Sequence, residues 1–423
     1  MSKVQNRKPL LERLSWLLAG VFIAVGIDVV SRHVITPRNE GTPLVRVSAK
    51  QNQLKSISGS WGVILVDPFP LKWSETYFYD KEKRLTSDRW AFSGTNLSII
   101  QESIARLTKP QELASEVAEA GRWRQDKTHF VFQPTSTFLT RLTPESRAEL
   151  YRLAGDNGNY SQQWPYRFTE HTFAERFGNS GLNKVQVKQI RDLCYWDCNL
   201  ISFCDVALLQ KNFDEKSFDE LIRVLNTIPS LRVRLHLCPS DSVTNLLAYW
   251  GRNQSVSRVK PILETLTSTS EGNEINICAL LPPFARTRLY GYPDAKTHEA
   301  ESRMDCFFTG MNFFNDAPDL RYLDNQVVKS RLKTKFRPVG NTPIFGDLLV
   351  LISAEGEAIH MAVYIADDIV FTKNGMTETQ PWTLMKIEDM LTYFPTRTPS
   401  KIYFVREIED VKAVTYHPVA NHD

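Results

Sequence analysis

The sequence has few cysteines, little net charge and no glycine-rich signature of a nucleotide-binding protein. Six cysteines among 423 residues are too sparse for a small domain stapled by disulfides. The formal net charge of +3 excludes a strongly basic surface for nucleic acid, so no DNA or RNA partner is expected. The sequence contains no Walker loop, no GxGxxG motif, no internal repeat and no cluster of metal ligands at standard spacing. We therefore expect neither a cofactor nor a metal.

Length and composition indicate a globular protein with more than one core. A chain of 423 residues exceeds what a single hydrophobic core ordinarily supports, so two folded domains and a tail are expected. Apolar residues make up 42% and charged residues 23% of the chain. These proportions exclude a disordered protein, because enough apolar surface is present to be buried.

The first 35 residues differ in character from the rest. Four basic residues precede a mostly apolar stretch, Leu14–Val30, which Asp28 interrupts near its end. As a helix this stretch spans about 25 Å, against about 30 Å for the hydrocarbon core of a bilayer. Residues 1–35 are predicted to be a cytoplasmic tail and a signal-anchor helix, left uncleaved because no small-residue cleavage site follows. The protein is then a single-pass membrane protein with its domains outside the cytoplasm; a buried or amphipathic N-terminal helix is the alternative.

Two regions follow the predicted anchor. Residues 36–60 are polar, contain Pro37 and Pro43, and are predicted to be a linker. Residues 61–285 are predicted to form an α/β domain, because strand and helix patterns succeed one another along its most regular part. Nothing in this region indicates an activity, so sensing, partner binding and positioning of the next domain all stay open.

Local patterns predict individual elements of this α/β domain. Period-two alternation over Leu231–Leu237 indicates a strand with His236 at its surface. Thr143 followed by Pro144 indicates a helix start. Further strands are expected at Trp61–Val66, ending at Asp67-Pro68, at His129–Phe132 and at Ile275–Leu280, and further helices over Asn96–Leu107, around Phe218–Leu225, from Asp241 and over Val259–Leu266.

The cysteines divide into one candidate nucleophile and five others. The five are predicted to be small buried hydrophobes; they are Cys194, Cys198, Cys204, Cys238 and Cys278. In an oxidising compartment a disulfide between Cys194 and Cys198, or between Cys198 and Cys204, is an open alternative.

Cys306 has the surroundings of a reactive thiol. Asp305 is a good N-cap, and it precedes an apolar stretch from Phe307 to Phe314. Cys306 would therefore lie in the first turn of a helix, where free backbone N–H groups and the helix dipole favour a thiolate. A structural buried thiol is the alternative.

A predicted β-hairpin follows and carries His360. Gly346-Asp347 precedes a strand at Leu348–Ile352, and Ile359–Ile365 has the alternation of the next strand. If a three-residue turn over residues 366–368 follows, paired positions sum to 734. Asn374 then lies opposite His360 and is predicted to orient its imidazole, with Thr372 diagonal on the same face.

These elements resemble the NlpC/P60 family of papain-like cysteine peptidases and amidases. The family has an Asp-Cys pair at a helix start, a Gly-Asp-Leu entry to a strand, and a histidine at the head of the next strand. Here they read Asp305-Cys306, Gly346-Asp347-Leu348 and His360–Ile365. The resemblance implies an α+β, papain-like domain over residues 286–423, in which the helix bearing the cysteine packs on an antiparallel sheet.

The resemblance also implies the roles of the site residues. Cys306 is the nucleophile, His360 its base, and the third polar residue falls twelve positions after the histidine, at Thr372; the register argument favours Asn374 instead. A tyrosine upstream of the cysteine lies near the oxyanion, which implies Tyr292, with Tyr290 as the alternative. Phe307 and Phe308 stand where the family has Ser-Gly, so Phe307 is expected to reshape the substrate groove.

The implied function is hydrolysis of amide bonds in cell-wall peptides. A peptide or peptidoglycan-like substrate agrees with a chain displayed outside a membrane. Two alternatives stay open. One is a papain-like enzyme acting on acyl groups of lipids, suggested by the phenylalanines around Cys306. The other is an inactive binding module on the same scaffold, suggested by the altered motif after Cys306.

Overall fold

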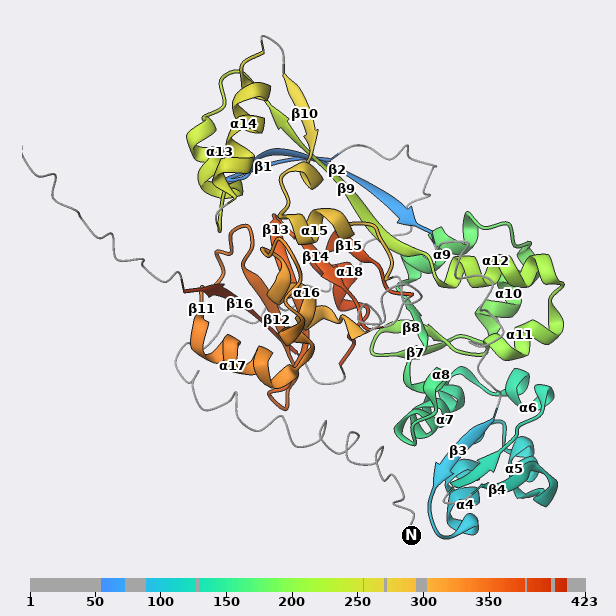
Figure 1. Ribbon diagram of the computed structural model, residues 1–423. Helices are drawn as coiled ribbons and strands as arrows, with labels where there is room; N and C mark the ends of the chain where they lie inside the picture. Colours follow the sequence, from blue (N-terminus) through green and yellow to red (C-terminus); the bar gives the residue numbers. More distant parts are fainter. Residues whose placement is uncertain are drawn as a thin grey trace, which may run out of the picture. The chain divides into compact units, whose positions relative to one another are not determined.

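The computed structural model describes most of the chain (Figure 1). The described residues are 55–72, 89–126, 129–253, 255–269, 272–293, 303–376, 379–396 and 400–408. The predicted signal anchor and residues 36–54 of the predicted linker lie outside them. Within the described ranges, no helix combines the length and the apolar character needed to cross a membrane.

The described residues form an α+β structure in two compact units. The first unit takes in residues 55–68, 231–387 and 400–408, and the second takes in residues 69–230 and 388–396. This division differs from the predicted boundary between residues 285 and 286. The reason is that residues 231–285 share one apolar core with the C-terminal part of the chain.

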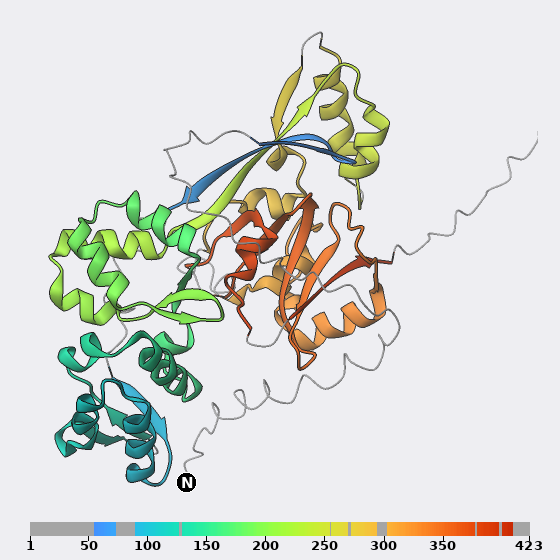
Figure 2. The same cartoon turned by 180° about the vertical axis from the view of Figure 1, so that it is seen from behind.

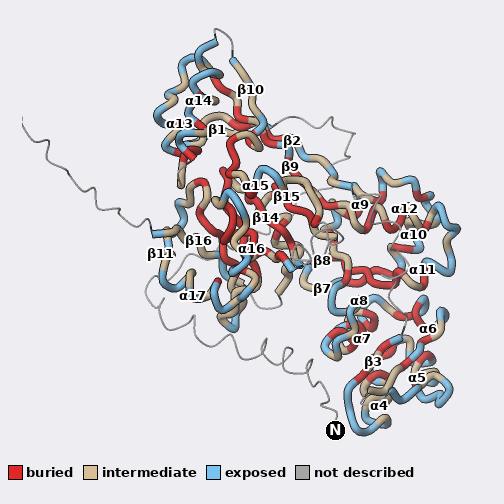
Figure 3. The backbone as a smooth tube through the Cα atoms, in the orientation of Figure 1, coloured by how far each residue is buried: buried red, intermediate tan, exposed pale blue. Residues whose placement is uncertain are grey.

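A six-stranded antiparallel sheet forms the centre of the first unit, in the order β11-β16-β12-β13-β14-β15. Its middle strands are buried along almost their whole length (Figure 3). The strands are β11 (Phe336–Pro338), β12 (Leu348–Ile352), β13 (Ala358–Ala366), β14 (Ile369–Lys373), β15 (Trp382–Lys386) and β16 (Lys401–Glu407). The accompanying helices are α15 (Pro283–Arg288), α16 (Cys306–Asn312), α17 (Asn325–Lys335) and α18 (Ile387–Leu391).

Helix α16 packs directly on β13 and β14. A glycine at its centre permits the close approach, because a Cβ added at Gly310 would lie 2.5 Å from Met361 Sδ. Phe308 is buried in the apolar core that α16 shares with the sheet. The expected arrangement of a cysteine-bearing helix on an antiparallel sheet is thus present.

A four-stranded sheet, in the order β1-β2-β9-β10, makes up the rest of the first unit. Two helices lie along one of its faces (Figures 1 and 2). The strands are β1 (Lys55–Gly59), β2 (Gly62–Leu71), β9 (Ile228–Leu237) and β10 (Asn273–Asn276), and the helices are α13 (Val243–Trp250) and α14 (Val256–Thr267). Trp250 joins this part to the core of the six-stranded sheet, with its ring centroid 5.1 Å from that of Phe345.

The turn that leads into β12 holds the buried carboxylate of Asp347. Arg406 on β16 binds it through two nitrogens, at 2.8 and 2.7 Å. Arg252, which follows α13, lies 3.1 Å from the same carboxylate. Gly346 has a φ of 87°, and a Cβ there would lie 2.1 Å from the Phe314 ring, so the turn requires glycine. The Gly-Asp pair of the predicted motif therefore anchors three segments of the first unit.

The second unit contains two three-stranded antiparallel sheets, β3-β5-β4 and β6-β8-β7. Their strands are β3 (Trp90–Ser93), β4 (Trp123–Asp126), β5 (His129–Phe132), β6 (Tyr166–Phe168), β7 (Tyr195–Asp197) and β8 (Leu200–Phe203). The helices are α4 (Leu97–Leu107), α5 (Ala114–Ala118), α6 (Ser136–Arg141), α7 (Pro144–Asp156), α8 (Tyr160–Gln163), α9 (Glu170–Gly178), α10 (Lys184–Asp192), α11 (Val206–Asn212) and α12 (Glu215–Leu225). Asp205 links them in the interior, since it pairs with Arg147 at 2.5 Å and accepts the Tyr151 hydroxyl at 2.6 Å.

Most of the local predictions are confirmed. The helices at 97–107 and 144–156 begin after the caps Asn96 and Thr143. The strands at 129–132 and 231–237 and the helices near 218, 243 and 259 are also present. The described cysteines are all free thiols, so neither disulfide alternative is formed.

Three local predictions are wrong. Residues 55–59 of the predicted linker form β1, whose polar composition reflects an exposed edge strand. Strand β2 continues through Pro68 to Leu71, so the Asp67-Pro68 pair does not end it; Pro68 lies beyond Lys55↔Val66, the last pair with β1 among the described residues. Strand β10 ends at Asn276, whose side chain accepts Cys278 N–H and starts a 3-10 turn.

The Asp347 carboxylate gives the first prediction. Asp347→Asn should lower the free energy of unfolding by about 3 kcal/mol, because two largely buried arginines lose their counter-charge. Asp319→Asn is the matched control, since Arg321, its partner, is exposed and such a pair contributes less than about 1 kcal/mol. Urea unfolding of the three proteins measures both values. Equal losses in the two variants would contradict the anchoring role.

Candidate active site

Cys306 is the first residue of α16, as predicted. Asp305 caps the helix, and its carboxylate accepts the N–H of Phe308 at 2.8 Å. The carbonyl of Asp305 also accepts the Thr309 hydroxyl at 2.8 Å. The sequence folds in this way because an aspartate before an apolar run satisfies helix N–H groups that have no partner within the helix.

The sulfur of Cys306 lies against the main chain of β13. It accepts hydrogen bonds from the N–H groups of Met361 and Phe307. The pairing of β13 with β14 runs from Ala366↔Ile369 to Val363↔Phe371. Met361 lies beyond the last pair of β13 with β14, and its N–H donates to the Cys306 sulfur. The contact places the thiol beside the residue that directly follows His360.

His360 lies on β13 and is completely buried. Its Nε2 is 2.9 Å from Thr372 Oγ1 on β14. The Thr372 hydroxyl in turn donates to Asn374 Oδ1 at 3.1 Å. The prediction that Asn374 orients the imidazole directly is therefore wrong for this nitrogen, because Thr372 occupies the position next to it. Asn374 follows the last residue of β14 and is one hydrogen bond further from the imidazole than Thr372.

The hairpin register matches the prediction although its turn does not. The turn contains two residues, Asp367 and Asp368, and not three. A bulge at Ile365 compensates, so that Tyr364 pairs with Val370 and Val363 with Phe371. The paired positions therefore still sum to 734, which is why His360 and Thr372 share a face.

Burial favours the neutral forms of the Cys306 thiol and the His360 imidazole. It raises the pKa of the Cys306 thiol above its ordinary range, and the neighbouring charge of Asp305 raises it further; the N–H groups and Lys373 act in the opposite direction. Burial also lowers the pKa of His360 to about 3. The expected thiolate at the helix start is therefore not the resting form, because desolvation outweighs the helix terminus. At neutral pH the pair is a thiol and a neutral imidazole.

The other predicted residues lie around this centre. Phe307 is half-buried and packs against the core of the first unit. Tyr292 is half-buried on a segment whose main chain pairs with the start of β15: Trp382 N–H donates to Gly291 at 3.0 Å. Tyr290, the alternative, donates its hydroxyl to the carbonyl of Leu231 at 2.7 Å. Neither tyrosine is placed at the sulfur by these contacts.

Two buried residues near the site, Trp382 and Lys373, were not predicted. Trp382 is buried and donates its indole N–H to Thr309 on α16 at 3.0 Å. Lys373 is completely buried beside it, with Nζ 5.6 Å from the centre of the indole ring. The signal for Lys373 was present in the sequence, as a lysine directly after Thr372 in an apolar strand.

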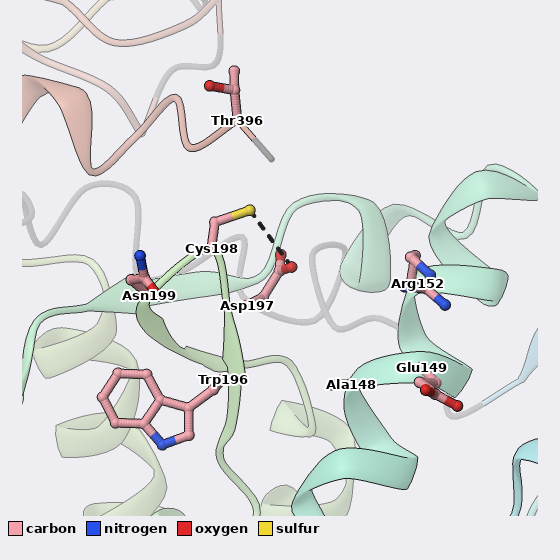
Figure 4. Close-up of a pocket in the computed structure, with 8 residues that line it drawn as sticks. All are labelled: Ala148, Glu149, Arg152, Trp196, Asp197, Cys198, Asn199 and Thr396. Carbon is pink, nitrogen blue, oxygen red and sulfur yellow. Dashed lines mark hydrogen bonds between the residues drawn. The ribbon is translucent and has the colours of Figure 1, made fainter. Parts of the chain in front are cut away.

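The second unit has a polar hollow of about 340 Å³. Figure 4 shows Cys198 and Asp197 at the turn between β7 and β8, with Glu149 and Arg152 on α7 across from them. The Cys198 thiol donates to Asp197 at 3.7 Å. The residues that line this hollow include no histidine that could serve as a base for Cys198.

No family model, curated protein or solved structure matches the chain.

The buried imidazole predicts an acid-labile fold. The folded protein binds fewer protons than the unfolded chain between pH 6.5 and about 3, the two pKa values of His360. The free energy of unfolding is therefore highest above pH 6.5 and falls as the pH is lowered, by at most about 5 kcal/mol at about 1.4 kcal/mol per pKa unit. In His360→Gln the free energy of unfolding should fall less steeply as the pH is lowered, because the unfolded chain takes up one proton fewer. Urea unfolding between pH 4 and 7 measures this slope.

The matched control is His171→Gln, since the side chain of His171 is 87% exposed. We expect its pH dependence to equal that of the unaltered protein. The predicted burial effect would be refuted by a His360→Gln protein that loses stability in acid as steeply as this control.

Proposed function

We propose that the C-terminal part of the first unit is a cysteine hydrolase of the NlpC/P60 type, with Cys306 as nucleophile and His360 as base. The observation that supports this most is the contact of the Cys306 sulfur with the N–H of Met361, the residue that follows His360 on β13; the imidazole of His360 is hydrogen-bonded to Thr372. In this proposal the nucleophile Cys306 lies against β13, the base His360 is on β13, and Thr372, which orients the base, is on the neighbouring strand β14.

The hydrogen bonds indicate which imidazole nitrogen is the base. The Thr372 hydroxyl donates to Asn374, so it accepts from His360 and the proton of the neutral imidazole is on Nε2. The Asn374 amide is held in this orientation by its contact with Met385 Sδ at 3.3 Å. Proton exchange with the thiol is therefore assigned to Nδ1.

The proposed reaction begins from the neutral pair. As the sulfur attacks the amide carbonyl, its proton passes to His360 Nδ1 and a C–S bond forms. The oxyanion is stabilised by the backbone N–H of Cys306. The C–N bond then breaks, and the imidazolium returns the proton to the leaving amine. Water hydrolyses the thioester and restores the thiol, with His360 as base.

The substrate class follows from the resemblance. Enzymes of the NlpC/P60 type act on cell-wall peptides, which suits the predicted display of the chain outside a membrane by residues 1–35. We therefore propose peptide amide bonds of the cell envelope as substrates.

The burial of the thiol supports a second candidate function. Cys306 is only 6% exposed and His360 is 0% exposed, which also suits a non-catalytic binding module. In that case the polar chain through Thr372 serves only to satisfy a buried histidine. The two candidates differ in whether the thiol reacts.

Variants of the nucleophile test the main proposal. Cys306→Ala should remove hydrolysis of peptidoglycan fragments, by about 10³-fold or more because the covalent route is lost. Cys238→Ala is the control for loss of a thiol and should keep full activity. Lipid esters are assayed beside the peptidoglycan fragments. Release of fatty acid from the lipid esters alone would identify an enzyme that acts on acyl groups of lipids.

An epoxide probe that alkylates thiols separates the binding module. Labelling of Cys306 in the native protein at neutral pH supports the enzyme. Absence of labelling, together with unchanged binding of fragments by Cys306→Ala, would leave the binding module as the function.

The relay of Thr372 gives a second catalytic prediction. Thr372→Val should lower kcat about 100-fold with little change in KM, because the imidazole loses the partner that sets its tautomer. Thr372→Ser should restore most of the rate, and Asn374→Ala should have a smaller effect. Thr383→Val is the matched control, since it removes another buried hydroxyl from the neighbouring strand. Equal rates for the two valine variants would show that Thr372 has only a packing role.

A further inference from the structure

The polar hollow of the second unit is lined by a tryptophan that the fold leaves exposed. Trp196 on β7 is 53% exposed, whereas the neighbouring Tyr195 is buried. Side chains alternate between the two faces of a strand, so the residue that packs inside is Tyr195 and Trp196 points outward. Among the described residues, the Trp196 indole has no hydrogen-bond partner and no ring contact. Its apolar surface and its N–H are therefore open to a ligand.

Helix α7 forms the other wall of the hollow. Glu149 and Arg152 are exposed on this helix and line the hollow from the side opposite Trp196 and Asn199 (Figure 4). Glu149 and Arg152 are three residues apart, but no ion pair joins them in the part of the chain that the structure describes. The hollow thus has an unpaired acceptor and an unpaired donor on one wall and an indole on the other.

The core beneath the hollow holds the two walls together. Tyr151, on the buried face of α7, packs edge-on against Tyr195, with ring centroids 5.4 Å apart. The Tyr151 hydroxyl donates to the buried carboxylate of Asp205 at 2.6 Å. Because Tyr195 directly precedes Trp196, these contacts fix the strand that carries the indole relative to the helix opposite. A preformed site of this kind loses little conformational entropy when a ligand binds.

The hairpin turn presents two further side chains to the hollow. Cys198 and Asn199 form the two-residue turn between β7 and β8, and their φ angles are 51° and 62°. Both angles lie in the left-handed region that such a turn requires and that favours glycine. Neither residue is glycine, and both line the hollow. The requirements of the turn therefore do not explain these two side chains.

The lining combines donors, acceptors and one apolar ring, which indicates the class of ligand. The Arg152 side chain only donates, an ionised Glu149 only accepts, and Asn199 does both. A phosphate would need donors throughout, and an organic ammonium would need acceptors. A neutral sugar has hydroxyl groups that donate and accept, and C–H groups on its ring faces that can pack on an indole. The volume of about 340 Å³ is at the lower end of the range for ligand pockets, about 300–1,000 Å³.

We propose that this hollow binds a neutral saccharide whose ring packs on Trp196. Glu149, Arg152 and Asn199 hydrogen-bond its hydroxyl groups. The inference goes beyond the proposed hydrolase, because it gives a binding function to the second unit and does not depend on Cys306.

The test is calorimetric titration of the full-length protein with two neutral probes, the linear trisaccharides of glucose and of N-acetylglucosamine. At least one should bind with a Kd below about 1 mM. Trp196→Ala should weaken this binding about tenfold or more, because the packing on the ring is lost, and Trp196→Phe should weaken it less. Trp164→Ala is the matched control. Trp164 is 57% exposed in the same unit but does not line the hollow, so the Kd should be unchanged.

Asn199→Gly separates the loss of a binding group from a folding defect. Glycine suits a φ of 62°, so urea unfolding should show a stability at least equal to that of the unaltered protein. The affinity should nevertheless fall about fivefold, because one hydrogen-bonding side chain is lost. An unchanged affinity in both Asn199→Gly and Trp196→Ala would overturn the site.

Two charged probes test the class of ligand. Tetramethylammonium and inorganic phosphate should each bind more weakly than the trisaccharide. Tighter binding of either ion, or no binding of either trisaccharide up to about 20 mM, would overturn the saccharide assignment. Cys306→Ala should bind the trisaccharide as the unaltered protein does, so the hydrolase proposal and the saccharide proposal succeed or fail by separate measurements.

Discussion

The proposed site depends on the point at which β13 and β14 stop pairing. The ladder between them ends at Val363↔Phe371, and a buried N–H beyond that point requires another acceptor. Met361 N–H finds it in the Cys306 sulfur. Gly310 makes this possible, because any larger residue would hold α16 away from Met361. A packing constraint in an opened hairpin therefore fixes where the thiol lies relative to the strand that carries His360.

Two polar arrangements lie near this point. Thr372 and Asn374 form a hydrogen-bonded chain that starts at the imidazole of His360, and Asp305 caps the helix that begins with Cys306. Asp347, which begins β12, holds the same sheet to β16 and to the segment after α13. The Gly-Asp element of the motif thus supports the scaffold, and the proposed chemistry is assigned to the Asp-Cys and histidine elements.

The local elements of this site could be predicted from sequence, but the partners between them could not. Asp305 indicated the start of α16, and alternation around His360 indicated β13, because capping and period-two burial are local properties. The choice between Thr372 and Asn374 depended on a bulge at Ile365 and on where β14 ends. Neither has a signature in the chain. The polar composition of residues 55–59 predicts a linker, because an exposed edge strand such as β1 has the same composition. The predicted thiolate form of Cys306 is wrong, because the burial that raises its pKa depends on the whole fold.

The neutral state of the buried pair is compatible with the proposed reaction. Burial raises the pKa of the thiol and lowers that of the imidazole, so both shifts oppose a resting ion pair. In the proposed reaction the proton therefore transfers only when attack begins. Burial alone accounts for the lowered pKa of His360, so the imidazole is protonated only while the negative charge of the oxyanion is present beside it in that reaction. A protonated, buried thiol is also a poor target for oxidants, which react with thiolates.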